Sequence, residues 1–398
     1  MLKTSVISTK TELRCFMKIA LLGHGVVGSG VSKIIDSGRT DELDRLEVKR
    51  ILVKDESEMT DPRTTLDFND ILNDPEIGLA AECMGGLEPA HTFVKKALES
   101  GKHVVTSNKK MLAVFFEELM ETAEANHVTL AYEASVGGGI PWIADLTRIR
   151  RIEMPDSFRG IFNGTTNYIL SGMYSEGKEF EDMLAEAQKL GYAEQDPSDD
   201  IDGMDVRYKC SITAAAAFDK WIDPEKIPVF GIRHIRKKDL DWGRSRGLVC
   251  KLIGSGKKNE DGISVLVRPV FLKEDDTFAG ILQNYNAIES ISATLGKAVF
   301  IGQGAGSLPT AHAVVQDMID IVTHTHRFAA EKTRAAGTVN TEPAVWYIRT
   351  SCPEAFTAVT AEKTGEDTIL TKAVSMDELL PAVRACEDPA LFLAEVAE

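Results

Sequence analysis

A run of carboxylates followed by a lysine is the part of the sequence best suited to acid–base chemistry. Six Asp or Glu side chains fall within residues 194–205, and Lys209 follows them. Asp205 and Lys209 lie four residues apart on a predicted helix and therefore on one helix face. The pair is either an ordinary helix ion pair, which stabilises by only a few tenths of a kcal/mol when exposed, or an ammonium held by a carboxylate for proton transfer. The residue pattern by itself leaves both interpretations open.

The same acidic run imitates part of a calcium-binding loop. Asp200, Asp202 and Gly203 have the order that such loops use. However, Ser198 occupies the first ligand position and Lys209 the twelfth, where a calcium loop needs a bidentate Glu. The sequence therefore argues against a calcium site.

Three glycines form a turn that could bind the phosphates of a dinucleotide. The turn, residues 23–28, follows an apolar run at 18–22 and precedes a helical pattern, and a second apolar run at 48–53 completes a β-α-β unit. Glycines let a pyrophosphate approach the helix N-terminus, where free N–H groups and the helix dipole favour negative charge. The sequence predicts NAD(P) binding here, through Gly23, Gly25, Val26, Val27 and Gly28.

The residues after the second strand bear on which cofactor is used. NAD enzymes place an acid near this point, whereas NADP enzymes accommodate the 2′-phosphate with a cation. Lys54 and Arg63 favour NADP, and Asp55 keeps NAD open. We expect NADP(H) to be used at least as well as NAD(H).

Three further polar segments could contribute to a site. Residues 106–110 (Thr-Ser-Asn-Lys-Lys) directly follow a predicted strand, and catalytic groups in open α/β sheets lie at the carboxyl ends of strands. A lysine there could orient a substrate carboxylate or carbonyl, although two lysines in a solvated loop are equally ordinary. Residues 160–170 and 302–306 each place glycines ahead of a helix, where backbone and hydroxyl groups can approach a small polar ligand.

These segments require an α/β architecture. Strands and helices alternate over 17–135, which predicts a Rossmann-type doubly wound parallel sheet. After a glycine-rich elbow that we expect to be flexible, strict alternation ends, and 136–309 are predicted to form an α+β catalytic and oligomerisation domain. An apolar helix within 310–330 is expected to return to the nucleotide-binding domain. Residues 331–398 are expected to form a small α+β C-terminal module, and residues 1–16 a tail.

Composition and charge narrow the class of protein. The chain has 398 residues, enough for two or three domains. Its net charge of −16 argues against binding to nucleic acid or to an anionic membrane. No apolar run approaches the ~20 residues that span a bilayer, no signal-peptide core opens the chain, and six scattered cysteines indicate a reducing compartment. We expect a cytoplasmic enzyme with no nucleic-acid or membrane partner.

The motifs occur together in an order that resembles the homoserine dehydrogenase family. The signatures are carried by residues 108–110, 133–137, 163–168 and 191–209, and the similarity runs from about Met17 to Val322. The resemblance implies NAD(P)-dependent interconversion of L-homoserine and L-aspartate 4-semialdehyde, in threonine, isoleucine and methionine biosynthesis. It also implies a homodimer or homotetramer and, with no aspartate kinase region in the sequence, the monofunctional form.

The resemblance also implies roles for single residues. Lys209 corresponds to the proton donor and acceptor, Asp205 to its supporting carboxylate, and Lys109 to a second active-site lysine. Burial would lower the pKa of Lys209, whereas the charge of Asp205 would raise it. The sequence does not decide which of the two effects is larger. The implied substrate-binding residues are Glu194 (for the ammonium), Asp200, Tyr192, Gly164 and Thr165. The implied cofactor-binding residues are Gly23, Gly25, Val26, Val27, Gly28, Lys54, Ser107, Lys109 and Gly304, and a sodium ion would bind the carbonyls of Glu133, Val136, Gly138 and Ile140.

The C-terminal segment resembles a degenerate, ACT-like regulatory module. Its second half, around 367–380, follows the usual pattern, whereas the first half is shortened between Cys352 and Glu366. We therefore expect weak or absent inhibition by threonine.

Two other functions fit parts of the sequence. One is another dinucleotide-dependent oxidoreductase acting on a different small carbonyl compound. The other is a catalytically silent sensor of nucleotides or amino acids. Lys209, Asp205 and Glu194 argue against the sensor, because a ligand-binding module needs no positioned proton donor.

Overall fold

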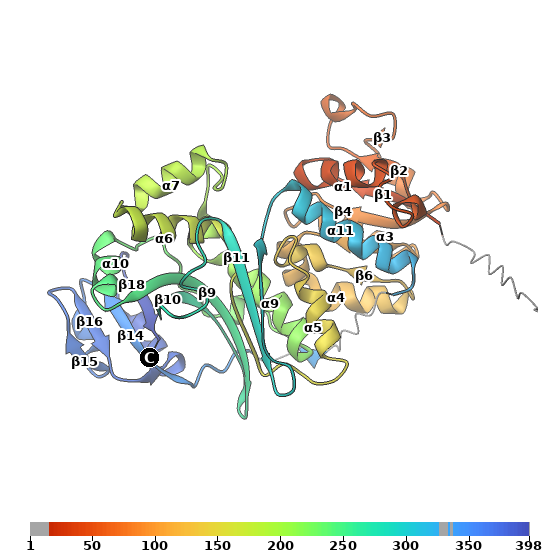
Figure 1. Ribbon diagram of the computed structural model, residues 1–398. Coiled ribbons are helices and arrows are strands. Elements are labelled where there is room, and N and C mark those ends of the chain that lie inside the picture. The colour runs from red at the N-terminus through yellow and green to blue at the C-terminus, as the bar shows by residue number, and fades with distance from the viewer. Residues whose placement is uncertain (1–15, 326–332, 335–336, 398) are drawn as a thin grey trace, which may run out of the picture.

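The computed structural model describes residues 16–325, 333–334 and 337–397 (Figure 1). The expected tail therefore lies almost entirely outside the described residues, as do the end of the 310–330 segment and the first residues of the 331–398 module.

A six-stranded parallel sheet forms the first domain, which confirms the predicted Rossmann-type fold. The sheet order is β3-β2-β1-β4-β5-β6, and it reverses between β1 and β4, where open α/β sheets place their ligand crevice. The strands are β1 (Met17–Leu22), β2 (Leu46–Leu52), β3 (Thr64–Thr65), β4 (Ile77–Glu82), β5 (His103–Thr106) and β6 (Leu130–Ala131).

Helices cover both faces of this sheet, as the alternation of its buried side chains requires. Ile19 and Leu21 of β1 belong to one hydrophobic cluster, and Ala20 and Leu22 to another. The first cluster is completed by α1 (Val26–Asp36) and by α11 (Ser307–Val322), which lie side by side in Figure 1. The second includes side chains of α2 (Asn69–Leu72), α3 (Ala90–Glu99) and α4 (Lys109–Ala125). The late helix α11 therefore packs on the nucleotide-binding domain, more than 280 residues after α1 begins.

The second domain is built on antiparallel strands with the order β12-β11-β7-β9-β10. Its strands are β7 (Ser157–Ile161), β9 (Leu248–Asn259), β10 (Gly262–Lys273), β11 (Tyr285–Ser292) and β12 (Gly296–Gln303), and two short strands, β8 (Lys220–Trp221) and β13 (Thr333–Arg334), pair separately. The helices are α5 (Trp142–Ile149), α6 (Gly164–Glu176), α7 (Phe180–Lys189), α8 (Ser198–Ile201), α9 (Met204–Phe218) and α10 (Lys237–Arg244).

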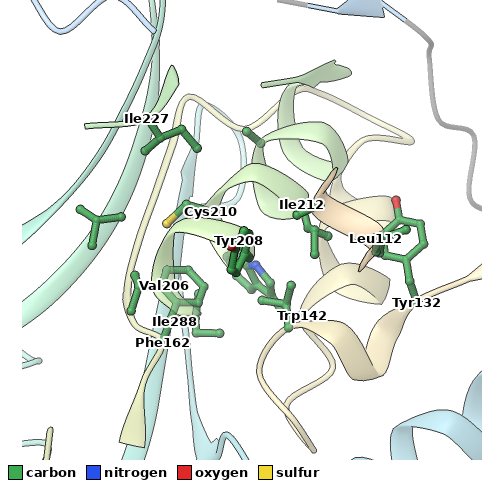
Figure 2. Packing of buried hydrophobic residues seen from close by; sticks show 14 of the residues in the cluster. Leu112, Tyr132, Trp142, Phe162, Val206, Tyr208, Cys210, Ile212, Ile227 and Ile288 are labelled. Atoms are coloured by element: carbon green, nitrogen blue, oxygen red, sulfur yellow. The ribbon is translucent and has the colours of Figure 1, made fainter. Parts of the chain in front are cut away.

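Helix α9 lies between the two domains and is buried on nearly all sides (Figures 1 and 2). Its side chains pack into one core with Trp142 from α5 and Phe162 after β7 (Figure 2). The second half of α9 is mostly apolar, as in helices that lie inside a core, and the polar side chains of Asp205 and Lys209 in its first half are buried with it. This enclosure determines the environment of Lys209, which lies on α9.

The C-terminal module continues the sheet of the second domain. It contains β14 (Pro343–Arg349), β15 (Thr360–Lys363), β16 (Thr368–Thr371), β17 (Val374–Ser375), α12 (Met376–Ala385) and β18 (Phe392–Val396). The order β18-β14-β16-β15 is that of a split βαβ module, but only the 3-10 turn η5 (Pro353–Phe356) stands in place of the first helix. Strand β18 pairs in parallel with β10, so the C-terminal module and the second domain share one sheet.

The glycine-rich elbow after β6 differs from its expected character. We predicted a flexible connection, but Val136, Gly137, Gly138 and Ile140 are all buried. Gly138 has φ 59°, and a Cβ atom built on it would lie 2.6 Å from the carbonyl carbon of Gly304. The elbow is a tightly packed crossing of two chain segments, because only residues without a Cβ can approach so closely.

Candidate active site

A cleft of about 960 Å³ opens between the two domains. One wall comes from the turn after β1, the start of α4 and the loop before α11. The other comes from the start of α6, from residues 190–200, which we call the acidic loop, and from α9. Of the predicted site residues, those that line it are Val26, Val27, Ser107, Lys109, Gly138, Gly164, Thr165, Tyr192, Glu194, Asp200, Asp205, Lys209 and Gly304.

Asp205 binds two lysines from different domains. Its Oδ2 atom lies 2.7 Å from Lys209 Nζ, one helical turn along α9, and its Oδ1 atom lies 2.9 Å from Lys109 Nζ on α4. Lys209 Nζ also donates to the carbonyl oxygen of Phe162 at 2.6 Å. Lys209 and Asp205 are buried, at 7% and 3% exposure, so the pair is not an ordinary surface ion pair.

The surroundings shift the pKa values of the two lysines in opposite directions. Burial lowers the pKa of Lys209, and the neighbouring Lys109 ammonium adds to this, so that the attraction of Asp205 does not prevail. The charge of Asp205 instead raises the pKa of Lys109. Burial acts to raise the pKa of Asp205, but the attraction of both ammonium groups outweighs it and lowers that pKa. Titratable groups whose pKa values are pushed apart in this way are typical of acid–base sites.

Asn163 was quoted in a motif but was not predicted as a site residue. Its Nδ2 atom donates to Asp200 Oδ1 at 2.7 Å and to Asp205 Oδ2 at 2.9 Å. Its Oδ1 atom accepts from the N–H of Thr166, which caps α6. The cap could have been read from the sequence, but not the contact with two carboxylates about forty residues away.

The acidic loop is tied to the start of α6. Thr165 Oγ1 donates to the carbonyl oxygen of Tyr192 at 2.6 Å. Asp200 is half-buried, and burial together with the charge of Asp205 raises its pKa. Glu194 is exposed and lines the cleft. The loop thus presents carboxylates of different exposure to one space.

The glycine turn has the shape that a dinucleotide requires. A Cβ atom on Gly28 would lie 2.1 Å from the carbonyl oxygen of Gly23, whereas one on Gly25 would have no atom within 4 Å. Gly28 is therefore required for packing, and Gly25 leaves open space at the start of α1. No side chain caps this helix, so its first N–H groups can bind a phosphate.

The two basic residues expected at the adenosine end differ in their surroundings. Lys54 is 78% exposed and lies 3.2 Å from Glu58, outside the residues that line the cleft. Arg63 is paired with Asp61 and with Asp36, which ends α1 at the far side from the glycine turn. Arg63 is therefore already bound to two carboxylates, and of these two basic residues the exposed Lys54 is the more available for a 2′-phosphate.

The four residues expected to hold sodium lie in the elbow and just before it, and Val136 among them is fully buried. Gly138 lines the cleft, while Glu133 and Ile140 line a second cavity of about 600 Å³ beside α5 and α11. The Glu133 carboxylate accepts the N–H groups of Ile143 and Ala144 at the start of α5, and burial raises its pKa to about 7. Among the described residues, no group of three His, Cys, Asp or Glu side chains could hold a metal ion.

Comparison with known proteins decides the family. A model described as the NAD binding domain of homoserine dehydrogenase matches residues 23–133, and a homoserine dehydrogenase model matches residues 141–319. The homoserine dehydrogenases of Synechocystis sp. and Lactococcus lactis are 39% and 37% identical to the chain, over 77% of its length and 73% and 74% of theirs. The chain belongs to the homoserine dehydrogenase family.

Solved structures extend the likeness to the C-terminal module. The crystal structure of a homoserine dehydrogenase from Thiobacillus denitrificans covers 96% of this chain with a TM-score of 0.85 and 29% identity, and 98% of its own length is matched. A homoserine dehydrogenase from S. aureus gives a TM-score of 0.75 over 96% of the chain. The predicted family and activity are thus confirmed: the chain is an NAD(P)-dependent oxidoreductase of homoserine biosynthesis, acting on a CH–OH group. None of the helices in the described ranges is long and apolar enough to cross a membrane.

Proposed function

We propose that Lys209 transfers the proton in the interconversion of L-homoserine and L-aspartate 4-semialdehyde. The observation that carries this assignment is the shared carboxylate of Asp205, beside which Lys209 has a lowered pKa and Lys109 a raised one. A group with a pKa closer to neutrality gives and takes a proton more readily. Lys109, held in its charged form, is better suited to stabilising negative charge on the substrate oxygen.

The remaining residues bind and orient the substrate in this proposal. When bound, the nicotinamide cofactor supplies or accepts the hydride. In the direction of reduction, Lys209 donates a proton to the aldehyde oxygen, and in oxidation the neutral amine takes the proton from the hydroxyl group. Asp205 and the carbonyl of Phe162 hold Lys209 Nζ in place, and Glu194 binds the substrate ammonium.

We propose that NADP(H) is used at least as well as NAD(H). Lys54 supports this, as does a hyperthermophilic archaeal homoserine dehydrogenase, 26% identical with a TM-score of 0.68, that was solved in complex with NADPH. The charge-assisted bond from Lys54 to the 2′-phosphate should contribute about 1.5 kcal/mol, or roughly tenfold in affinity. Absorbance assays with homoserine should show kcat/KM for NADP⁺ at least equal to that for NAD⁺, and Lys54→Ala should lower only the former. A clear NAD⁺ preference that Lys54→Ala leaves unchanged would contradict the proposal.

We also propose a sodium ion at the elbow, held by the carbonyls of Glu133, Val136, Gly138 and Ile140. The positive φ angles of Gly137 and Gly138 support it, because they turn successive carbonyl groups out of line. A plain domain junction is the alternative. Activity should then rise when sodium chloride replaces choline chloride at constant ionic strength, whereas equal rates in both salts would favour the junction.

We propose a cytoplasmic homodimer or homotetramer without nucleic-acid or membrane partners. The net charge of −16 supports the absence of polyanionic partners. Self-association is supported by the edge strand β12, where Ile301 is 55% exposed. Sedimentation equilibrium of the purified chain distinguishes these states from a monomer.

A further inference from the structure

A second buried lysine lies beneath the substrate side of the cleft and takes no part in the proton transfer. Lys251 on β9 is 0% exposed. Its Nζ atom donates to Asn167 Oδ1 at 2.8 Å, to Ser171 Oγ at 3.1 Å and to the carbonyl oxygen of Ile281 at 2.6 Å. These three acceptors are neutral, and burial lowers the pKa of Lys251 to about 8. Buried ammonium groups are normally paired with a carboxylate, so this placement costs stability that a purely structural residue would avoid.

One face of α6 connects this lysine with the carboxylates of Asp200 and Asp205. Asn163, Asn167 and Ser171 are spaced four residues apart and lie on the same side of the helix. Asn163 donates to Asp200 and Asp205, whereas Asn167 and Ser171 accept from Lys251. A rotation or shift of α6 around Lys251 would therefore move Asn163 relative to both carboxylates.

Lys251 also holds the segment 281–286 against α6. The carbonyl of Ile281 accepts from Lys251 Nζ and from Asn167 Nδ2, and Asn167 Nδ2 donates to the carbonyl of Tyr285 at 3.0 Å. Between them, Asn284 lines the cleft, and a Cβ atom on Gly164 would lie 2.7 Å from its carbonyl oxygen. The start of α6 and this segment are thus in direct contact at the substrate side.

The same segment reaches the proton carrier through one carbonyl group. Asn286 Nδ2 donates to the carbonyl oxygen of Phe162 at 2.9 Å, and this oxygen also accepts from Lys209 Nζ at 2.6 Å. Lys251 is therefore connected to the active site along two routes, through α6 to Asp205 and through segment 281–286 to Lys209.

We infer that Lys251 is a positioning residue for the substrate: it clamps α6 to segment 281–286 and so sets the places of Gly164, Thr165 and Asn284 in the cleft. The inference rests on the proposed function, in that the clamped wall is taken to bind homoserine. The glycine turn and α1 lie in the other domain, so the clamp acts on substrate binding and not on the cofactor.

The variant Lys251→Met tests the inference, because methionine keeps most of the volume and removes all three donated bonds. If the displaced wall weakens substrate binding by as much as one hydrogen bond from a charged donor, the KM for homoserine should rise roughly tenfold. The KM for NADP⁺ should change by no more than about twofold. A general loosening of the protein would instead raise the KM values of both ligands equally. Steady-state kinetics with each ligand varied in turn measures the two values.

Lys102→Met is the matched control. Lys102 is also buried, at 5% exposure, and donates to the backbone carbonyls of Asp74 and Ile77 at 2.8 and 2.9 Å, but it lies in the nucleotide-binding domain away from the cleft. Its replacement should lower the melting temperature and leave the KM for homoserine unchanged. If Lys251→Met does not fold, Ser171→Ala removes one acceptor only and should raise the same KM by a smaller factor.

Two results would overturn the inference. One is a folded Lys251→Met enzyme, or failing that Ser171→Ala, with an unchanged KM for homoserine. The other is a parallel rise of both KM values. Failure of the proposed function is seen separately, as a wild-type enzyme that oxidises homoserine with neither NADP⁺ nor NAD⁺.

Discussion

Replacement of Lys209 by methionine should lower kcat for homoserine oxidation by roughly 10²–10⁴-fold, the range for loss of a general acid or base. The Lys209 side chain is buried beside Asp205 and lines the cleft, so a lysine on the protein surface cannot take its place there. Affinity for NADPH, measured by fluorescence titration, should change little, because the dinucleotide binds at the glycine turn in the other domain. Glu194→Ala should instead show part of its loss in the KM for homoserine.

Lys237→Met provides the control for the loss of a helix ion pair. Lys237 pairs with Asp241 at the same four-residue spacing, but both side chains are partly exposed, at 38% and 42%. Its replacement should cost little stability and leave kcat unchanged. A Lys209→Met enzyme with normal melting behaviour and near-normal kcat would contradict the assignment, and Lys109 would become the proton carrier.

The pH dependence of the reaction provides a second test of Lys209. Homoserine oxidation needs the neutral amine, so its rate should rise with pH through the lowered pKa of Lys209, while aldehyde reduction should fall. Asp205 favours the charged amine and opposes the effect of burial. Asp205→Asn should therefore move the midpoint of the oxidation profile to lower pH, and a move to higher pH would show that another group is titrating.

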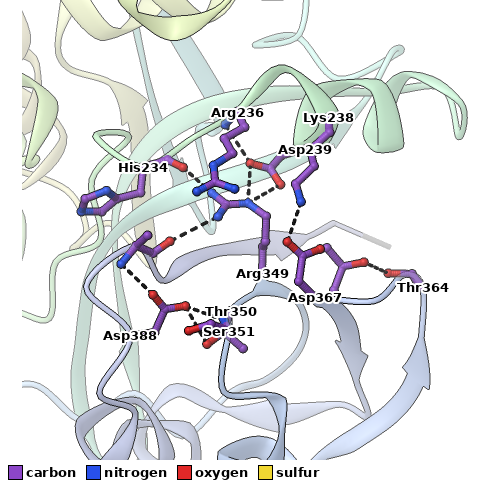
Figure 3. Close-up of polar contacts among 12 residues, drawn as sticks. His234, Arg236, Lys238, Asp239, Arg349, Thr350, Ser351, Thr364, Asp367 and Asp388 are labelled. Carbon is purple, nitrogen blue, oxygen red and sulfur yellow. Dashed lines mark hydrogen bonds and ion pairs between the residues drawn. The ribbon is translucent and has the colours of Figure 1, made fainter.

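Replacement of Arg349 by methionine should destabilise the protein by about 3–5 kcal/mol, the usual cost of leaving one member of a buried ion pair without its partner. Arg349 on β14 is 2% exposed and its Nε atom lies 2.9 Å from Asp239 Oδ1 on α10, which is 0% exposed (Figure 3). The guanidinium group also donates to the carbonyls of His234 and Ala390. The pair joins the C-terminal module to the second domain, so unfolding in urea should report the loss directly.

Two further variants distinguish the cost of leaving the buried Asp239 charge unpaired from the cost of losing an ion pair as such. Lys238→Met removes the neighbouring pair with Asp367, whose side chains are 47% and 38% exposed, and should cost less than about 1 kcal/mol. The double variant Asp239→Asn with Arg349→Met leaves no unpaired charge and should recover part of the loss. If the Arg349→Met protein is as stable as the Lys238→Met protein, the buried Asp239 carboxylate does not need Arg349 to compensate its charge, and the prediction is wrong.

Local features of the site could be predicted because they depend on short stretches of chain. The glycine turn, the strand–helix alternation and the spacing of Asp205 and Lys209 are determined by backbone geometry over a few residues, and the structure has all three. The structure adds surroundings that a local pattern does not show. Glycines at 137–139 indicated flexibility, but the segment is closely packed, and Gly138 passes close to Gly304. Arg63 indicated a phosphate site, but two carboxylates already bind it.

The sequence alone was sufficient to determine the family and the Rossmann-type domain, and it placed Asp205 and Lys209 on one helix face, since each depends on residue type and short spacing. Only the tertiary structure decided that Lys109 shares Asp205 with Lys209, that Asn163 bridges Asp200 and Asp205, and that Asp239 meets Arg349 across 110 residues. The tertiary structure also decided the direction in which the pKa of Lys209 shifts. The physical reason is that desolvation depends on everything packed around a group, and α9 is enclosed by segments from both domains that no local pattern brings together.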